Sequence, residues 1–80
     1  MQIPVIKHLA ETFTTEQLKA AEAAILNEQK PAIAVEGKDE GEQLTHVLAA
    51  IEIHHDMERS KIDFRTALRN YSQRVRNSIS

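Results

Sequence analysis

The sequence predicts an all-α fold, a small bundle of about four helices with a short extended segment near residues 31–36. Apolar residues recur at helical spacing in four separate stretches, which is the pattern of helices that bury one face. Only two glycines and two prolines interrupt the chain, and 28% of its residues are charged, a composition that suits a compact helical protein. With 80 residues there is room for one core, so we expect a single helical domain over residues 1–80.

The first two predicted helices cover residues 4–13 and 15–29. Pro4 suits the first turn of a helix, where its missing N–H costs no hydrogen bond. The apolar positions of the two helices are Val5, Ile6, Leu9, Phe13, Leu18, Ala21 and Ile25. Thr14 and Gln17 fit a capping box, in which each side chain bonds the other residue's backbone N–H, so the second helix is expected to begin after Thr14.

The extended segment begins at Pro31, which disfavours helical geometry in the residue before it and is expected to end the second helix. Residues 32–36 alternate in character and include the β-branched Ile33 and Val35. Because one strand cannot form a sheet alone, the segment is either an extended linker that lays these side chains on the helices or a strand that pairs with a second chain. The linker is the favoured interpretation.

The third helix is predicted over residues 40–58, and the last helix begins at Ser60 or Asp63. Asp39 and Glu42 offer a second capping pair at the start of the third helix. The apolar stripe of the third helix is Leu44, Val47, Leu48, Ile51 and His55. The last helix has the most regular stripe in the chain, formed by Phe64, Ala67, Leu68, Tyr71, Val75 and Ile79.

The net charge of −2 hides a strong asymmetry. Residues 1–58 hold four Lys or Arg and eleven Asp or Glu, a balance of −7, whereas residues 59–80 hold six Lys or Arg and one Asp, a balance of +5. So small a chain buries only about 60% of its unfolded surface, and without cysteine it has no disulfide to reinforce it. We therefore expect a homodimer in which the acidic residues 1–58 of one copy face the basic residues 59–80 of the other. Binding to a different protein is the alternative.

The stretch I-E-I-H-H-D-M-E-R, residues 51–59, places two of the four histidines among three carboxylates. Glu52 and His55 stand in E-x-x-H spacing, which puts a carboxylate and an imidazole on one helix face, and His46 is the third candidate metal ligand. A metal site there needs further carboxylates from a facing helix or a second copy. A solvated helix end explains the stretch without a metal, because the helix dipole favours histidine there. The sequence therefore predicts no cofactor, with a metal or small-ligand site as the alternative.

Arginines of the last helix form the other candidate surface. Arg65, Arg69 and Arg76 lie four and seven residues apart and line one stripe, whereas Arg74 lies off that line. Such a stripe can follow a phosphate backbone, but the chain is acidic overall and has no aromatic platform for bases, so nucleic-acid binding ranks third. Ion pairing, within the chain or across a dimer, is favoured. The expected carboxylate partners are Glu52, Asp56 and Glu58.

Sequence signals of catalysis and of membrane insertion are absent. The chain contains no phosphate-binding glycine loop, no zinc-protease histidine motif and no nucleophile elbow, so we do not expect an enzyme. No apolar run approaches the roughly 18 residues of a membrane span. The first residues lack the basic start and long apolar run of a signal peptide, and a cytoplasmic location is therefore expected.

Two parts of the chain carry family-like motifs: IPVIKHL at residues 3–9, and AAIEIHHDMERS followed by ALRNYSQRVRNSI at residues 49–79. These motifs resemble a family of small, uncharacterised bacterial helical proteins of unknown function, while the middle of the chain departs from it. The resemblance implies a short cytoplasmic helical protein without an assigned activity or ligand, in which Arg74 matters beyond packing. We therefore expect a non-catalytic interaction module that self-associates.

Overall fold

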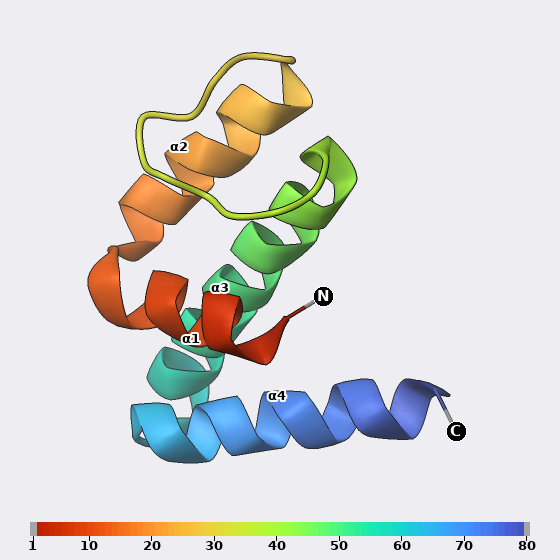
Figure 1. Ribbon diagram of the computed structural model, residues 1–80. Helices are drawn as coiled ribbons and strands as arrows, with labels where there is room; N and C mark the ends of the chain where they lie inside the picture. The colour runs from red at the N-terminus through yellow and green to blue at the C-terminus, as the bar shows by residue number, and fades with distance from the viewer. Residues whose placement is uncertain (1, 80) are drawn as a thin grey trace.

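The computed structural model describes residues 2–79 and contains four α-helices and no strand within that range (Figure 1). The helices are α1 (Ile3–Thr12), α2 (Thr15–Leu26), α3 (Glu40–Ser60) and α4 (Phe64–Ile79). The predicted all-α bundle of about four helices is therefore confirmed. Over the same residues, none of the helices is both long enough and apolar enough to cross a bilayer.

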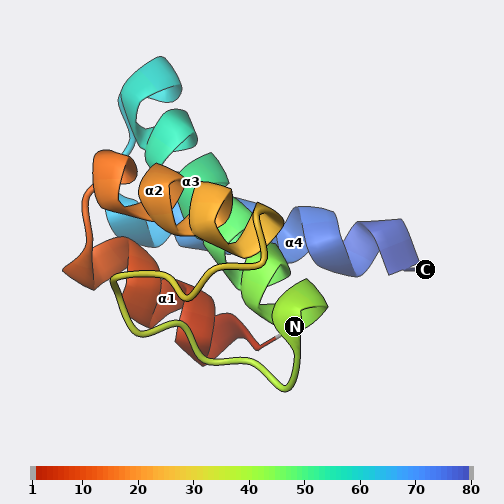
Figure 2. The same cartoon turned by 90° about the horizontal axis from the view of Figure 1, so that it is seen from above.

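The longest helix, α3, is the centre of the fold, because α1, α2 and α4 each pack against it (Figures 1 and 2). The buried hydrophobic residues form one cluster drawn from all four helices. The largest side chains with almost no exposed surface are Ile6, Leu9, Leu18, His46, Val47 and Ile53. Three of these lie on α3 and the other three on α1 and α2, so the core lies mainly between the first three helices.

The start of α2 has the capping box that the sequence predicts. The Gln17 backbone N–H donates to the Thr14 hydroxyl oxygen at 3.2 Å, and the Thr14 backbone N–H donates to the Gln17 side-chain oxygen at 2.9 Å. The box satisfies two N–H groups that a helix start otherwise leaves without partners. It fixes the sharp junction between α1 and α2.

The end of α2 comes three residues earlier than predicted, at Leu26 rather than residue 29. Glu28 takes a left-handed backbone conformation with φ 57°, and the N–H of Gln29 donates to the carbonyl of Ala24 at 2.8 Å. This is the bond of a Schellman motif, which closes a helix by itself. The prediction was wrong here because it placed the stop at Pro31, whereas the backbone turn comes first.

The segment between α2 and α3 packs as an extended linker without forming a strand. Ile33 and Val35 are half-buried against the hydrophobic core, while Ala32, Ala34 and Glu36 are exposed. This alternation is the one that the sequence predicts for the linker interpretation. Pairing of the segment with a second chain stays a prediction.

The start of α3 is capped by Asp39, since the Glu42 backbone N–H donates to the Asp39 carboxylate at 2.8 Å. The reciprocal bond of the predicted capping pair is displaced by one residue. The Glu42 carboxylate accepts from the backbone N–H of Lys38 at 3.3 Å instead of that of Asp39. The helix then continues to Ser60, two residues beyond the predicted end, and stops at Lys61, which is left-handed with φ 52°.

The buried face of α3 differs from the predicted stripe. Leu48, placed in that stripe, is 43% exposed, and His55 is only half-buried. The buried residues are His46, Val47, Ala49, Ala50, Ile51, Ile53 and Asp56. A single stripe was the wrong expectation because three helices surround α3, and a helix with several neighbours buries a wide arc instead of one narrow face.

The last helix, α4, begins after Asp63, one of the two predicted starts. The backbone N–H of Thr66 donates to the Asp63 carboxylate at 2.8 Å. Of the predicted apolar stripe, Ala67 alone is fully buried among the α4 side chains described, and Phe64, Leu68 and Tyr71 are half-buried. The side chain of Ile79, also predicted in the stripe, lies outside the described residues. The most regular apolar stripe of the sequence is thus the least covered one.

Candidate functional site

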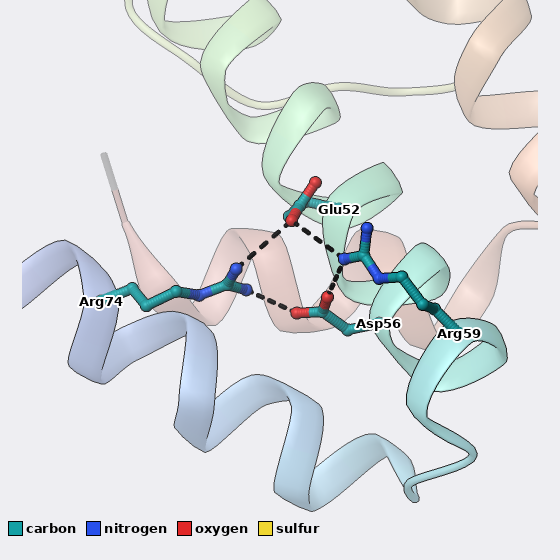
Figure 3. A network of polar contacts seen from close by, with 4 residues as sticks. All are labelled: Glu52, Asp56, Arg59 and Arg74. Carbon is teal, nitrogen blue, oxygen red and sulfur yellow. Dashed lines mark hydrogen bonds and ion pairs between the residues drawn. The ribbon is translucent and has the colours of Figure 1, made fainter.

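The strongest cluster of charged side chains joins α3 to α4 (Figure 3). Arg74 of α4 contacts two carboxylates of α3, Asp56 at 2.5 Å and Glu52 at 3.3 Å. Arg59 also contacts both carboxylates, Asp56 by a hydrogen bond and Glu52 at 3.6 Å. We call these four residues the α3/α4 ion-pair network.

The spacing of these residues along α3 builds the network. Glu52 and Asp56 are four residues apart and share one helix face, and Arg59 follows Asp56 by three. Asp56 is only 8% exposed, and a carboxylate so far from water needs charged or hydrogen-bonding partners. Because each of its oxygens contacts one arginine, the requirement is met. The first role of the network is therefore to fasten α4 to α3.

Two further electrostatic effects occur near Asp56, a pKa shift of Arg59 and a contact between Arg74 and an aromatic ring. The hydrogen bond to Asp56 raises the pKa of the exposed Arg59 above its ordinary value. The Arg74 guanidinium lies 5.8 Å from the centre of the Tyr71 ring, within the range of a cation–π contact. Partial burial raises the pKa of Tyr71 above its ordinary value, and the neighbouring Arg74 opposes that shift. Tyr71 and Arg74 thus act together at the α3/α4 contact.

The structure brings together part of the predicted arginine set. Arg74, which the sequence pattern places off the stripe and the family resemblance singles out, is the α4 arginine that pairs with Glu52 and Asp56. Arg65, Arg69 and Arg76 are exposed and form no ion pair with any residue in the range 2–79. The side of a helix that meets a neighbour depends on how the two helices cross, which spacing along one helix does not reveal.

His46 lies apart from the other candidate ligands and is fully buried. Its Nε2 accepts a hydrogen bond from the backbone N–H of Gln2 at 3.0 Å, which places the ring proton on Nδ1. Nδ1 then donates to the carbonyl oxygen of Glu36 at 2.8 Å. Both ring nitrogens are therefore engaged, and His46 ties the start of α1 and the linker to α3.

His54 makes a second link of this kind, one that the sequence pattern did not predict. Its Nε2 donates to the carbonyl oxygen of Ala10 at 2.8 Å, and its Nδ1 accepts from the Thr15 hydroxyl at 2.9 Å. Eight residues separate His46 from His54, so both lie on neighbouring sides of α3. The position of each histidine within the third helix, beside the apolar Val47 or Ile53, is the sequence signal that could have indicated both links.

Glu52 and His55, the remaining metal candidates, are half-buried, and Glu52 belongs to the ion-pair network. Across residues 2–79 the structure brings no three His, Asp or Glu side chains close enough to hold a metal ion together. His55 instead borders a shallow groove between α2 and α3. The three predicted ligands therefore do not converge within one chain.

The comparisons with known proteins define the family. A family of unknown function, DUF6952, matches residues 1–80. The chain belongs to this family. No curated protein and no solved structure matches it. The predicted resemblance to an uncharacterised family is confirmed, and the match includes the middle of the chain, which the sequence motifs had left out.

In this member of the DUF6952 family, the buried and half-buried polar side chains stabilise the fold. Asp56, His46 and His54 each hold two parts of the chain together through charged or hydrogen-bonded contacts. The solvent-exposed charged surfaces include a basic outer side of α4 and an acidic region around the linker. The candidate functional surfaces therefore lie on the outside of the molecule.

Proposed function

We propose that the protein is a non-catalytic helical module that self-associates as a homodimer and acts by binding. The single observation that carries this proposal is the incomplete burial of α4. Its apolar stripe is the most regular in the chain, yet among its described side chains only Ala67 is fully buried. An amphipathic helix gains its stability from covering its apolar face, so a further surface is expected to cover the rest.

The total exposed surface supports the same proposal. The chain exposes 5357 Å², whereas a compact monomer of 9.1 kDa exposes about 4,900 Å². Leu48, on the outward side of the central helix, contributes to the excess. At about 25 cal/mol for each Å² of apolar surface, covering such positions in a dimer adds to a fold whose small size leaves little margin.

The way ionisable groups are used supports binding over catalysis. Asp56 is paired with two arginines, and His46 and His54 use both ring nitrogens in hydrogen bonds that join segments of the fold. A catalytic acid or base must face a substrate and change its protonation during the reaction. Groups held in structural bonds of this kind are poorly suited to that work.

We also propose a cellular location for the protein. A location in a bacterial cytoplasm is supported by the resemblance of its motifs to a family of small bacterial proteins. Cell fractionation with an antibody against the chain tests this part, and recovery of the protein in a membrane or secreted fraction contradicts it.

Light scattering coupled to gel filtration tests self-association directly. We expect a mass near twice 9.1 kDa at submillimolar concentration, falling toward one chain on dilution. Val75→Glu places a carboxylate on the half-buried side of α4 and is expected to give a monomer. Ala20→Glu adds the same charge at an exposed position of α2 and should leave the mass unchanged. A wild-type mass of one chain at every concentration refutes the proposal, whatever the variants do.

A further inference from the structure

The outer side of α4 carries a ridge of three exposed arginines, Arg65, Arg69 and Arg76, which we call the arginine ridge. On a helix these positions fall within about 40° of one another, and they lie on the side opposite the buried Ala67. None of the three forms an ion pair with a carboxylate in residues 2–79, although Arg65 and Arg69 lie near enough to Asp63 to help lower its pKa. The half-buried Val75 and Leu68 flank the ridge on one side. The ridge is therefore a basic surface with an apolar border.

At the other end of the molecule lies an open groove of about 470 Å³ between the end of α2, the linker and the start of α3. Its apolar lining includes Ile25, Ile33 and Val35. Its charged lining is formed by Glu28, Glu36, Glu40 and a single cation, Lys30. We call this feature the acidic groove, and its chemistry is the complement of the arginine ridge.

The acidic groove is held in shape before anything binds. The linker is tied to the core where the carbonyl of Glu36 accepts from His46. The next residue, Gly37, lies so close to α3 that a Cβ there would stand 2.8 Å from the Gln43 side chain. A surface that is already ordered loses less conformational entropy when a partner docks. The groove is thus suited to a rigid partner such as a helix.

The ridge and groove of one chain cannot meet. In Figure 1 the linker and the start of α3 lie at the top of the molecule, and α4 runs across the bottom, with the body of the bundle between them. We infer that the arginine ridge of one copy docks in the acidic groove of a second copy. This inference rests on the proposed self-association, and it covers the part of the α4 apolar stripe that borders the ridge, Leu68 and Val75.

The contact has a defined chemistry. The arginines of the ridge face Glu28, Glu36 and Glu40 across the rim, and Val75 brings an apolar side chain toward Ile33 and Val35. Charges at an exposed rim steer the two surfaces together and select the partner, while the apolar contact supplies affinity. Association is therefore expected to weaken as salt rises, because screening acts on exposed charges.

Charge-reversal complementation tests the inference. The variants Arg69→Glu/Arg76→Glu and Glu36→Lys/Glu40→Lys each place like charges across the contact. We expect each alone to dimerise about tenfold more weakly, or not at all. In an equimolar mixture, either ridge–groove contact between the two different variants pairs opposite charges, so association between them should recover. Light scattering gives the mass, and a mass-tagged copy of one variant identifies the mixed dimer.

A matched control separates this contact from a general effect of net charge. Glu16→Lys/Glu58→Lys changes the charge by the same amount at exposed positions of α2 and α3, and Glu16, like Glu40, lies in the first turn of a helix. This variant should dimerise like the wild type and should not rescue Arg69→Glu/Arg76→Glu. Circular dichroism checks that all variants are folded.

The outcomes distinguish the two claims. A wild-type monomer refutes the proposed self-association and the ridge–groove contact with it. A wild-type dimer that both reversals leave intact, or reversals that fail to complement, refutes the ridge–groove contact alone. Retention of single-stranded DNA at about 50 mM salt that disappears in Arg69→Glu/Arg76→Glu, with the dimer unaffected, assigns the ridge to nucleic acid and also overturns the inference.

Discussion

The first three helices and α4 are attached to the molecule by different forces. Between α1, α2 and α3 the contact is mainly apolar, with large side chains such as Ile6, Leu18 and Ile53 almost entirely removed from water. On α4, Ala67 is the fully buried apolar side chain among those described, Phe64, Leu68 and Tyr71 are only half-buried against the core, and Arg74 adds charged contacts to α3. Salt does not screen apolar burial, and salts such as sulfate strengthen it, whereas exposed ion pairs are weakened as salt rises. The difference implies that α4 opens more readily than the core.

Truncation of the core should produce the largest effect. Leu18→Ala removes a fully buried side chain between α2 and α3, and such a change costs about 2–5 kcal/mol of the free energy of unfolding. In so small a domain this loss is a large part of the total stability. Chemical denaturation measures it. Leu26→Ala, at a position 62% exposed, is the control and should change the free energy of unfolding by less than about 0.5 kcal/mol.

Removal of the buried histidine is the next largest change. His46→Ala leaves the N–H of Gln2 and the carbonyl of Glu36 without their partner and opens a cavity, at a cost of about 3 kcal/mol. Hydrogen exchange should show that protection is lost first at the start of α1 and in the linker. A loss spread evenly over the chain contradicts the role of His46 as a link between these two segments.

The α3/α4 ion-pair network should give a smaller and more local effect. Arg74→Ala leaves one oxygen of Asp56 without its arginine, and we expect a loss of about 1–2 kcal/mol, since the guanidinium is half exposed and screened by water. Limited proteolysis should cut within α4 before the core. Arg74→Lys, which keeps the charge but loses the two-pronged geometry, should recover only part of the loss.

The smallest effect is expected at the cap of α4. Hydrogen bonds from Thr66 lower the pKa of Asp63 below its ordinary value of 3.8. Because the folded-state pKa lies below the unfolded value, the ionised cap stabilises the fold above that unfolded value, and the stabilisation fades as pH falls through the folded pKa. Asp63→Asn keeps a capping oxygen but does not titrate. Denaturation at neutral and acid pH should therefore show a smaller acid-induced loss for the variant than for the wild type.

Local features of the fold were predictable from the sequence because they depend on neighbouring residues. The caps at Thr14, Asp39 and Asp63 are examples, since each side chain bonds a backbone N–H three residues away. The number of helices followed from apolar spacing for the same reason. The end of α2 was missed because Glu28 is not glycine, the usual residue for a left-handed helix stop.

Features that depend on the packing of distant segments were not predictable. Leu48 was expected inside, and His46 was a candidate ligand only for the alternative metal site, yet Leu48 is exposed and His46 is buried. Which sides of α3 meet α1, α2 and α4 depends on the crossing of the helices, and apolar spacing within α3 does not determine it. The charge asymmetry was visible in the sequence. Helical spacing could not show that Arg74 is the arginine that pairs with α3, because this depends on how α4 is oriented against α3.

Native-state hydrogen exchange at two protein concentrations tests the central contrast most directly. In dilute protein the α4 amides should exchange through local openings of lower free energy than those of α1, α2 and α3. At high concentration α4 should gain protection, because docking on a second copy covers its outer side. Equal protection of α4 and α3 at both concentrations contradicts the account, since it places α4 in the same stable unit as the core and leaves it without a partner.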